Sequence, residues 1–434
     1  MNLKALAARN RSFAADVGWS MAHDGTTVVA NLVAFLLLGR NLGDAGYGAY
    51  VGVFGIIGPL AGLAWAGVGL AALQRIIRDQ DDPAQVSRRM LGQGLLTGLG
   101  GTVVAIVIGA MFIRTLPLID IAALVVAELL ALNVVLISAF VLQGVEGVPA
   151  ASRLRIVVVA VRLLIVVGLH QLDLLTIRNI GLSGIVLFTL LTAWVLLVRL
   201  PKAGISVRPG RPRRGDARLA FSFSVPMVGS NIQLDGDKTV LNAYGMADVA
   251  GVYGAAFRVI NMAMTPIRAL QAAAFNRLLP HDEAAVGQHT RRARRFAFLN
   301  LVAVLPVCAV LFFAVDLLKP LLGDDFEESA RMARWLLLFL PLKAVSDAPL
   351  GGLLGLGRAT TRAWCMLAAA GCSLGLYVVL IPMWSWAGAV VGTVVGEFIL
   401  LVVGTQRLVT WQRRHDDGVS NAEAVAPDLD DVPA

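Results

Sequence analysis

The stretch PLIDIAALVVAELLALNVVLISAFVL, residues 117–142, decides the fold class of this chain. It contains only two charged side chains, Asp120 and Glu128. A transmembrane α-helix needs roughly 20 apolar residues to cross a hydrocarbon core of about 30 Å. The stretch therefore predicts a membrane-spanning helix, and it places Glu128 inside the membrane.

The rest of the chain has the same character. Its 434 residues are 57% hydrophobic and only 15% charged, with a mean hydropathy of +0.74. A soluble domain carries about 25% charged residues. The composition therefore predicts an all-α integral membrane protein with room for about a dozen spans and no sizeable soluble domain. The three cysteines lie in apolar runs without metal-ligand spacing, so we expect reduced packing residues.

Hydropathy and helix breakers together predict twelve transmembrane helices. The first six are expected at residues 18–39, 47–72, 91–113, 117–142, 154–171 and 179–198. The second six are expected at residues 219–243, 249–275, 296–318, 333–356, 362–382 and 386–409. The fifth span contains Arg162 and the seventh contains Asp235, Asp237 and Lys238, so these two are the least apolar of the set.

Positive charge predicts the orientation, because cytoplasmic loops retain Lys and Arg. Of the 37 Lys and Arg residues, 26 lie before the first span, after the last span or in alternate loops. Only six lie on the opposite side: Arg40, Arg114, Arg178, Lys319, Arg331 and Arg334. We therefore expect both termini in the cytoplasm. The surplus positive charge is assigned to this topology and to anionic lipid headgroups, not to nucleic acid.

The span pattern divides the chain into two halves. A cytoplasmic N-terminal segment (1–17) precedes an N-lobe of six spans (18–198), and a basic cytoplasmic linker (199–218) leads to a C-lobe of six spans (219–411). The acidic tail (412–434) is expected to be cytoplasmic and disordered. Because each half has an even number of spans, both halves start in the cytoplasm, and the repeats are predicted to be parallel.

A short internal echo supports this duplication. DGTTVVAN (residues 24–31) in the first span resembles DGDKTVLN (residues 235–242) in the seventh. A Gly-Tyr turn follows each of them, and the next span is interrupted by proline, at Pro59 in one half and Pro266 in the other.

Several stretches together resemble a known family. They are DGDKTVLNAYG (235–245), VAGVYGAAFR (249–258), LGRNLGDAGYGAY (38–50), LGDDF (322–326) and LIPMWSWAGA (380–389). They are similar to polysaccharide flippases of the O-antigen type, in the multidrug/oligosaccharidyl-lipid/polysaccharide exporter superfamily. The resemblance covers nearly the whole chain. It implies two six-helix lobes facing each other across a central cavity, and movement of a polyprenyl-pyrophosphate-linked oligosaccharide from the inner to the outer leaflet.

Ionisable residues inside the spans are the informative ones, whatever the family. Each costs at least about 2.5–3.5 kcal/mol at the bilayer centre, so each should face a partner or a wet cavity. The intramembrane cations are Arg162, Lys238, Arg258, Arg268 and Lys343. The intramembrane acids are Asp24, Glu128, Asp235, Asp237, Asp347 and Glu397.

The eighth span carries a polar stripe, because its polar side chains recur at steps of three and four residues: Arg258, Asn261, Thr265 and Arg268. One polar face on an apolar helix predicts that the face lines a cavity, and Pro266 within it offers a place to bend. The alternative is that Asp235 or Asp237 neutralises Arg258 and Arg268, which then only hold the bundle together.

Arginine offers a planar fork that binds phosphate oxygens in pairs, which suits a pyrophosphate headgroup. The predicted substrate-binding residues are Arg258, Arg268, Lys238, Asp235, Asp237, Asn261, Arg162 and Lys343. The predicted ion-coupling candidates are Asp24, Glu128, Asp347 and Glu397. Two alternatives stay open: Lys343 and Asp347 could pair along one helix, and Asp237 with Lys238 could form a solvated helix end.

The sequence contains no nucleotide-binding loop, no metal-binding pair of histidines and no serine elbow. We therefore predict no catalytic residue, no metal and no cofactor. The leading hypothesis is a flippase of the bacterial cytoplasmic membrane that serves surface polysaccharide, such as lipopolysaccharide, by alternating access. Expected partners are the lipid-linked oligosaccharide, membrane lipids and polysaccharide assembly enzymes.

Two rival functions remain. One is an ion-coupled multidrug exporter of the same superfamily. The other is an integral-membrane polysaccharide polymerase or glycosyltransferase, an enzyme class that usually carries a substantial outer loop. The longest outer segment here, around 320–328, is short, which argues against this enzyme class.

Overall fold

The computed structural model describes residues 3–205, 208–278, 289–356 and 358–425, and every regular element within them is a helix. Side chains are described for 15–205, 208–265, 293–354, 356 and 358–413. The first half comprises α1 (Leu3–Ala61), η1 (Gly62–Ala66), α2 (Gly67–Ile77), α3 (Pro83–Phe112), α4 (Leu118–Val126), η2 (Ala127–Ala131), α5 (Asn133–Glu146), α6 (Val148–Gln171), α7 (Ile177–Trp194), η3 (Val195–Arg199) and α8 (Leu200–Lys202).

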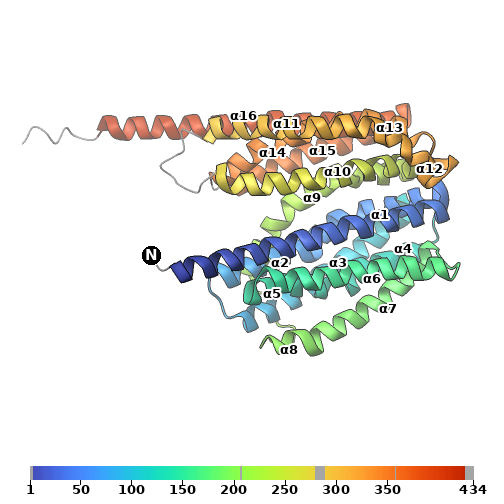
Figure 1. Ribbon diagram of the computed structural model, residues 1–434, viewed down its shortest axis with the longest axis horizontal. Helices are drawn as coiled ribbons and strands as arrows, with labels where there is room; N and C mark the ends of the chain where they lie inside the picture. Colours follow the sequence, from blue (N-terminus) through green and yellow to red (C-terminus); the bar gives the residue numbers. More distant parts are fainter. Residues whose placement is uncertain (1–2, 206–207, 279–288, 357, 426–434) are drawn as a thin grey trace, which may run out of the picture.

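The second half comprises α9 (Arg214–Ala243), α10 (Ala247–Leu278), α11 (His289–Ala314), η5 (Val315–Leu317), α12 (Leu318–Leu322), η6 (Asp324–Phe326), α13 (Ser329–Leu336), α14 (Phe339–Gly355), α15 (Ala359–Trp384) and α16 (Trp386–Val425). Figure 1 shows the two halves as separate lobes, with α1 on one side of their junction and α10 on the other. The predicted architecture of twelve transmembrane helices in two six-helix lobes is confirmed.

Helix α1 contains two spans. Its 59 residues would extend about 90 Å at 1.5 Å per residue, three times the thickness of a hydrocarbon core. Gly43 interrupts it with φ 66° and ψ −177°, a backbone conformation that favours glycine. The break separates the first half of α1 (3–42) from its second half (44–61), as the two predicted spans require.

Apolar length alone identifies only part of the membrane domain. Among the described residues, seven helical stretches are long and apolar enough to cross a membrane, and α13 with α14 makes an eighth if this pair, bent by 42°, is one span. Helices α6 and α9 do not pass this test, nor does the part of α10 whose side chains are described, 247–265. They carry the charges of the fifth, seventh and eighth predicted spans. These three helices therefore owe their place in the membrane to packing between other helices.

A glycine-rich seam joins the lobes. The second half of α1 runs antiparallel to α9, and three side chains of α9 donate hydrogen bonds to backbone carbonyls of α1. Asn242 donates to Gly48 at 2.8 Å, Thr239 to Gly52 at 2.9 Å, and Asn231 to Gly58 at 2.7 Å. Small residues let helix backbones approach closely in membranes, and interhelical hydrogen bonds then add to the packing. The seam places the two lobes in direct contact.

Several glycines of the seam leave no room for a side chain. A Cβ at Gly48 would collide with backbone atoms of Ala247 and Gly251, and one at Gly67 would collide with Ser224. The step from Gly62 to Gly67 is five residues long and coincides with the π-helical segment η1. A π-helical turn, with its i to i+5 bonds, is wider than an α-helical turn. It therefore keeps the later glycine on the face that contacts α9.

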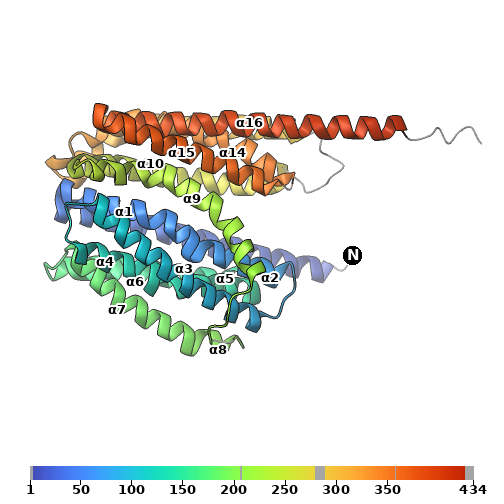
Figure 2. The ribbon, with the colours of Figure 1, turned by 180° about the vertical axis from the view of Figure 1, so that it is seen from behind.

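Helix α9 bends across both lobes (Figure 2). Pro226 lies inside it and removes a backbone hydrogen bond. Before the bend, the buried carboxylate of Asp216 pairs with Arg75 at 3.1 Å and with Arg89 at 3.4 Å. These ion pairs hold the beginning of the C-lobe against the N-lobe. We call Asp216, Arg75 and Arg89 the latch.

The chain ends are more helical than predicted. Residues 1–17 are predicted as a cytoplasmic N-terminal segment, and helix α1 begins within this segment, at Leu3. Helix α16 continues to Val425, into the segment expected to be a disordered tail, whereas residues 426–434 lie outside the described residues. The beginning of α1 and the end of α16 lie at the same end of the bundle, which we call the end of the termini (Figure 1).

We expect Gly48→Val to force the lobes apart at the end far from the termini, because its side chain would occupy the position of the α10 backbone. The measurement is crosslinking of Arg40→Cys to Leu321→Cys by a short bifunctional thiol reagent, in a chain whose three native cysteines are replaced by serine. The Arg40 side chain spans from one position to the other, with Nε 2.6 Å from the Leu321 carbonyl oxygen, so the parent chain should crosslink efficiently and the Gly48→Val chain poorly.

Gly100→Val is the matched control, because nothing lies within 4 Å of a Cβ at Gly100. It should leave the crosslink unchanged. Equal crosslinking in the Gly48→Val and Gly100→Val chains would contradict the proposed role of the seam.

Removing the latch carboxylate should destabilise the protein. Asp216→Ala leaves the largely buried Arg89 without this partner, and breaking such a pair costs about 3 kcal/mol. Asp79→Ala should cost less than about 1 kcal/mol, because Asp79 and its partner Arg75 are more than a quarter exposed. Thermal unfolding of the detergent-solubilised variants measures the difference, and equal midpoints for the two variants would argue against the latch.

Candidate functional site

A cavity of about 360 Å³ lies between the two lobes, as the predicted architecture requires. Both halves of α1 form its N-lobe wall together with α4, η2, α6 and α7, whereas α9 and α10 form its C-lobe wall. Its charged and amide lining residues are Asn31, Glu128, Arg162, Asp235, Lys238, Arg258 and Asn261. Three cations and two carboxylates give the lining a net positive charge.

The cavity is closed at the end far from the termini. Arg40, at the C-terminal end of the first span, donates to the Leu321 carbonyl oxygen at 2.6 Å. The rings of Tyr47 and Phe326 pack edge to face, with centroids 6.2 Å apart. Both contacts cross from one lobe to the other. Toward the termini, the first half of α1 and α10 diverge (Figure 1).

The closed end holds polar groups with unused hydrogen-bonding capacity. The Arg258 guanidinium lies beside the hydroxyls of Tyr47 and Tyr50. Apart from this contact between the two side chains, neither Arg258 Nε nor the fully buried hydroxyl of Tyr47 has a hydrogen-bond partner among the described residues. Buried polar groups normally have partners. Because both residues line the cavity, they can donate to an anion within it.

Lys238 lies at the C-lobe wall of the cavity, where two carboxylates hold it. Its Nζ is 3.0 Å from Asp235 Oδ1 and 3.2 Å from Asp237 Oδ1, and it lies 4.0 Å from the ring centroid of Phe257. The side chain of Asp237 is fully buried. The alternative that Asp237 and Lys238 form a solvated helix end is therefore wrong. Asp235 borders the cavity, and Asp237 lies behind it.

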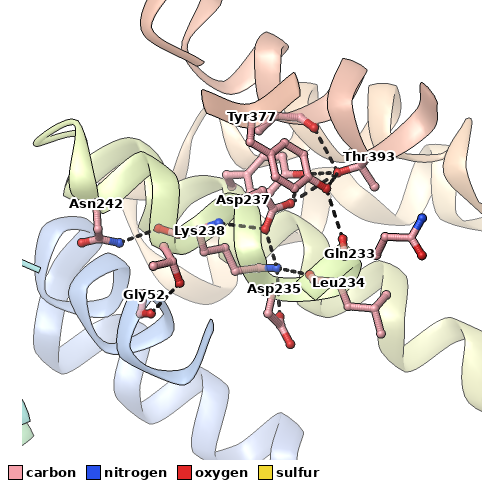
Figure 3. A network of polar contacts seen from close by, with 12 residues as sticks. Gly52, Gln233, Leu234, Asp235, Asp237, Lys238, Asn242, Tyr377 and Thr393 are labelled. Atoms are coloured by element: carbon pink, nitrogen blue, oxygen red, sulfur yellow. Dashed lines mark hydrogen bonds and ion pairs between the residues drawn. The ribbon is translucent and has the colours of Figure 1, made fainter. Parts of the chain in front are cut away.

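Behind the wall, Asp237 belongs to a buried network of hydroxyls (Figure 3). Its Oδ2 accepts a hydrogen bond from Tyr253 at 2.7 Å and one from Thr393 at 3.4 Å. Thr393 Oγ1 in turn lies 3.0 Å from the hydroxyl of Tyr377. This network joins α9, α10, α15 and α16.

On the opposite wall, Arg162 of α6 forms an ion pair with Glu128 of η2. The Arg162 side chain is 46% exposed and that of Glu128 is 12% exposed. The pair therefore presents its cation to the cavity more than its acid. The predicted substrate ligand Arg162 and the predicted ion-coupling residue Glu128 are thus partners.

Lys343 does not line the cavity. Its Nζ lies 3.1 Å from Asp347 Oδ1 and 3.5 Å from Glu397 Oε1, inside the C-lobe. Ser346 donates to the same Glu397 oxygen. The alternative in which Lys343 pairs with Asp347 along one helix is the one that the structure shows. Lys343, Asp347 and Glu397 thus form one cluster, away from the lobe junction.

Three further predicted residues differ in their placement. Asn261 lines the cavity one turn along α10 from Arg258, as the polar stripe predicts. Asp24 is exposed on the first half of α1 and is not a lining residue. The Arg268 side chain lies outside the described residues, so its predicted role stays a prediction.

The aromatic residues of the site were missed by sequence reasoning. Tyr47, Tyr50 and Trp65 line the cavity, and Tyr253 and Tyr377 belong to the buried network. A signal was present, because the chain has only five tyrosines and four of them lie at this site. Scarce hydroxyl-bearing rings inside apolar spans favour polar partners.

Comparisons with known proteins agree with this architecture. The sequence model of a family described as polysaccharide biosynthesis protein matches residues 13–275. No curated protein matches the chain.

Solved structures of transporters share the fold. One is the outward-facing conformation of a multidrug resistance MATE family transporter of the MOP superfamily, with TM-score 0.64 and 16% identity over 94% of this chain and 96% of that chain. The inward-facing conformation of such a transporter has TM-score 0.65 and 15% identity over 89% and 96%. A MOP superfamily transporter from Pyrococcus furiosus, reported for the reverse polarity of its binding pocket, has TM-score 0.61 and 16% identity over 91% and 95%.

The closed end predicts one-sided access to the cavity. In a chain without native cysteines, Asn31→Cys should react with a membrane-impermeant maleimide only from the side that carries the termini. Labelling of right-side-out and inside-out vesicles measures this, and protease access to a C-terminal tag identifies the side.

Leu96→Cys is the control, because this side chain is 62% exposed on the mid-section of α3 and should face lipid. It should react from neither side. Labelling of Asn31→Cys from the side opposite to the termini would contradict a cavity closed at that end.

Proposed function

The chain belongs to the polysaccharide biosynthesis protein family, and on this premise we propose that it is a flippase for a polyprenyl-pyrophosphate-linked oligosaccharide. Its membrane-spanning fold is shared with transporters. The cavity receives the anionic headgroup, and the lipid tail remains in the bilayer. A volume of about 360 Å³ suits the pyrophosphate and the first part of a glycan.

One observation carries the proposal. The Arg258 guanidinium and the Tyr47 hydroxyl lie against each other, Arg258 Nε and this hydroxyl have no further hydrogen-bond partner among the described residues, and both side chains line a cavity with net positive charge. A pyrophosphate oxygen offers both groups an acceptor. Arg162 on the opposite wall is nearly half exposed and can approach the same headgroup from the other side. Binding between the two walls would then depend on how far the lobes are apart.

Alternating access is the mechanism that we propose. The lobes touch at the end far from the termini, through Arg40 with Leu321 and through Tyr47 with Phe326. Opening of these contacts together with closure at the other end would expose the headgroup to the opposite leaflet. The latch between Asp216 and Arg75 holds the termini side of α9 on the N-lobe during this motion.

The location and partners follow from the same proposal. A lipid-linked oligosaccharide is assembled at the cytoplasmic membrane, so we place the protein there with both termini in the cytoplasm. The surface polysaccharide that it serves would include lipopolysaccharide. Polysaccharide assembly enzymes that use the flipped product are the further partners that we propose.

A multidrug exporter is the second candidate, favoured by the carboxylates Glu128 and Asp235 on the cavity lining. Organic cations require such acids. Here, however, Arg162 pairs with Glu128, and Lys238 pairs with Asp235. An organic cation would have to displace these ammonium and guanidinium groups, whereas a phosphate could approach Arg258, which forms no ion pair with a carboxylate among the described residues.

Binding of farnesyl pyrophosphate by the purified protein tests the proposal. Arg258→Ala should weaken binding roughly 10- to 100-fold, because a hydrogen bond to a charged group contributes about 1.5–3 kcal/mol. Arg258→Lys keeps the charge but loses the planar fork, so it should bind with intermediate affinity. In cells, Arg258→Ala should reduce surface glycan and accumulate unflipped precursor.

Arg178→Ala is the control, because Arg178 pairs with Asp120 outside the cavity and is half exposed. It should bind like the parent protein. Farnesol, which lacks the pyrophosphate, should not compete with the probe. Tight binding of rhodamine 6G together with no binding of farnesyl pyrophosphate would favour the exporter instead.

A further inference from the structure

The two walls of the cavity differ in character. The C-lobe wall carries four charged or amide side chains: Asp235, Lys238, Arg258 and Asn261. On the N-lobe side, α4, η2, α6 and α7 contribute one ion pair, Arg162 with Glu128, whose charges offset each other. Every side chain of 118–194 is described, and no further polar side chain of this stretch lines the cavity.

The apolar residues of this wall form a distinct part of the cavity. We call it the apolar compartment, and it consists of Leu124, Ala127, Ile165, Val166, Ile180 and Phe188. Each of these side chains is between 2% and 9% exposed, so the helices enclose the compartment closely. An apolar wall opposite a charged one gives a ligand a fixed orientation, because each part of the ligand is stable only against the matching wall.

Two glycines of α7 shape the compartment. At Gly181, a Cβ would lie 2.7 Å from the carbonyl carbon of Ala123, so α7 and α4 are in backbone contact there. Gly184, about one turn further along, borders the cavity itself. A Cβ at Gly184 would lie 3.0 Å from the Cβ of Ala127, at the edge of the compartment. Glycine at this position therefore leaves space that a side chain would fill.

The compartment lies on the closed side of the ion pair. His170 Nδ1, near the end of α6, lies 3.3 Å from Asn41 Oδ1. Asn41 follows Arg40, which closes the cavity, so α6 ends at the closed end. The turn of α6 after Arg162, which holds Ile165, is therefore nearer to the closed end than the ion pair is. Helix α7 begins at the same end, because only a short connection separates it from α6.

The direction of entry determines which part of the proposed substrate reaches the compartment. A headgroup that enters from the open end leads with its glycan, because the lipid tail stays in the bilayer. The charges of Arg162 and Arg258 both act on the hydroxyl of Tyr50, so these two cations lie near one another across the cavity. Pyrophosphate bound between them places the first sugar just beyond, at the compartment.

A sugar that is hydroxylated at every position would suit the compartment poorly. A buried hydroxyl without a hydrogen-bond partner is costly. The side chains of the compartment offer no partner, and the backbone groups around them bond within their own helices. A methyl group has no such requirement. It occurs on sugars in two places, in an acetamido group and at carbon 6 of a deoxy sugar.

We propose that the apolar compartment binds a methyl-bearing substituent of the sugar next to the pyrophosphate. The inference rests on the proposed function and adds selection of the glycan to it. The cations recognise pyrophosphate in any substrate of this class, whereas the compartment distinguishes one first sugar from another. An apolar pocket discriminates by a modest factor between ligands that differ by one methyl group.

The first isoprene unit of the lipid is the rival occupant, because it is also apolar. It is bonded to the opposite side of the pyrophosphate from the sugar. With the tail leaving through the open end, this unit points away from the compartment. The position of the compartment on the closed side of Arg162 therefore favours the sugar.

Three synthetic probes test the inference with the purified protein: farnesyl pyrophosphate linked to glucose, to 6-deoxyglucose and to N-acetylglucosamine. At least one of the two methyl-bearing probes should bind roughly 4- to 10-fold more tightly than the glucose probe, as expected for burying one methyl group. The probe that gains affinity identifies which substituent the compartment accepts.

Val166→Thr should remove most of this preference, because it places a hydroxyl in the compartment at nearly the same side-chain volume. Ile180→Thr introduces a hydroxyl from α7 and serves as the second variant if Val166→Thr does not fold. Val157→Thr is the matched control, because Val157 lies on the same helix as Val166, is 38% exposed and does not line the cavity. It should keep the preference of the parent protein.

Unlinked farnesyl pyrophosphate separates this inference from the proposed function. A parent protein that binds it, but binds the three sugar probes equally, would overturn the inference and leave the proposed function standing. A parent protein that binds none of the four compounds would overturn both. A preference that survives both Val166→Thr and Ile180→Thr would show that the compartment does not select the sugar. Equal weakening of farnesyl pyrophosphate and of the preferred sugar probe by Val166→Thr would assign the compartment to the isoprenoid instead.

Discussion

Polar groups within a membrane must find partners inside the protein, and the seam between the second half of α1 and α9 shows how this constraint shapes the molecule. Asn231, Thr239 and Asn242 satisfy their side chains by donating to backbone carbonyls of the other lobe. Close approach requires glycine on the receiving helix. The same contact therefore joins the lobes, aligns α9 beside α1, and brings Asp235 to the edge of the cavity between them.

The charged residues are arranged in two layers around this seam. Cations with available donors, above all Arg258, face the cavity, whereas the buried acids lie behind its wall with lysines between them. This arrangement, with cations at the cavity and acids behind its wall, follows from the free-energy cost of burying a charge. A guanidinium at the cavity wall can be neutralised by an anion that enters the cavity, whereas a carboxylate within the helix packing needs a partner inside the protein. An anionic substrate would meet the cations first, and the acids would respond only through the shared lysines.

Much of the site could be predicted because helical periodicity is a local property. The stripe of Arg258 and Asn261 faces the cavity because residues three apart share one face of α10. Lys343 could not be placed in this way. A lysine inside a span needs either an acidic partner or water, and helical periodicity does not distinguish between these two environments. Its partner Glu397 is 54 residues away along the chain, on a helix whose position depends on the packing of the whole C-lobe.

The sequence by itself determined the membrane location of the helices, their number, the break near Gly43 and the scarcity of charges inside them, because each of these depends on local hydropathy and backbone freedom. Only the tertiary structure decided which charges meet. It paired Arg162 with Glu128 and placed Arg258 beside Tyr47 at the wall of the cavity. These pairings depend on the rotation and tilt of helices that are distant in sequence. The packing of all twelve spans together sets that rotation and tilt, so no single stretch of the sequence can predict the pairings.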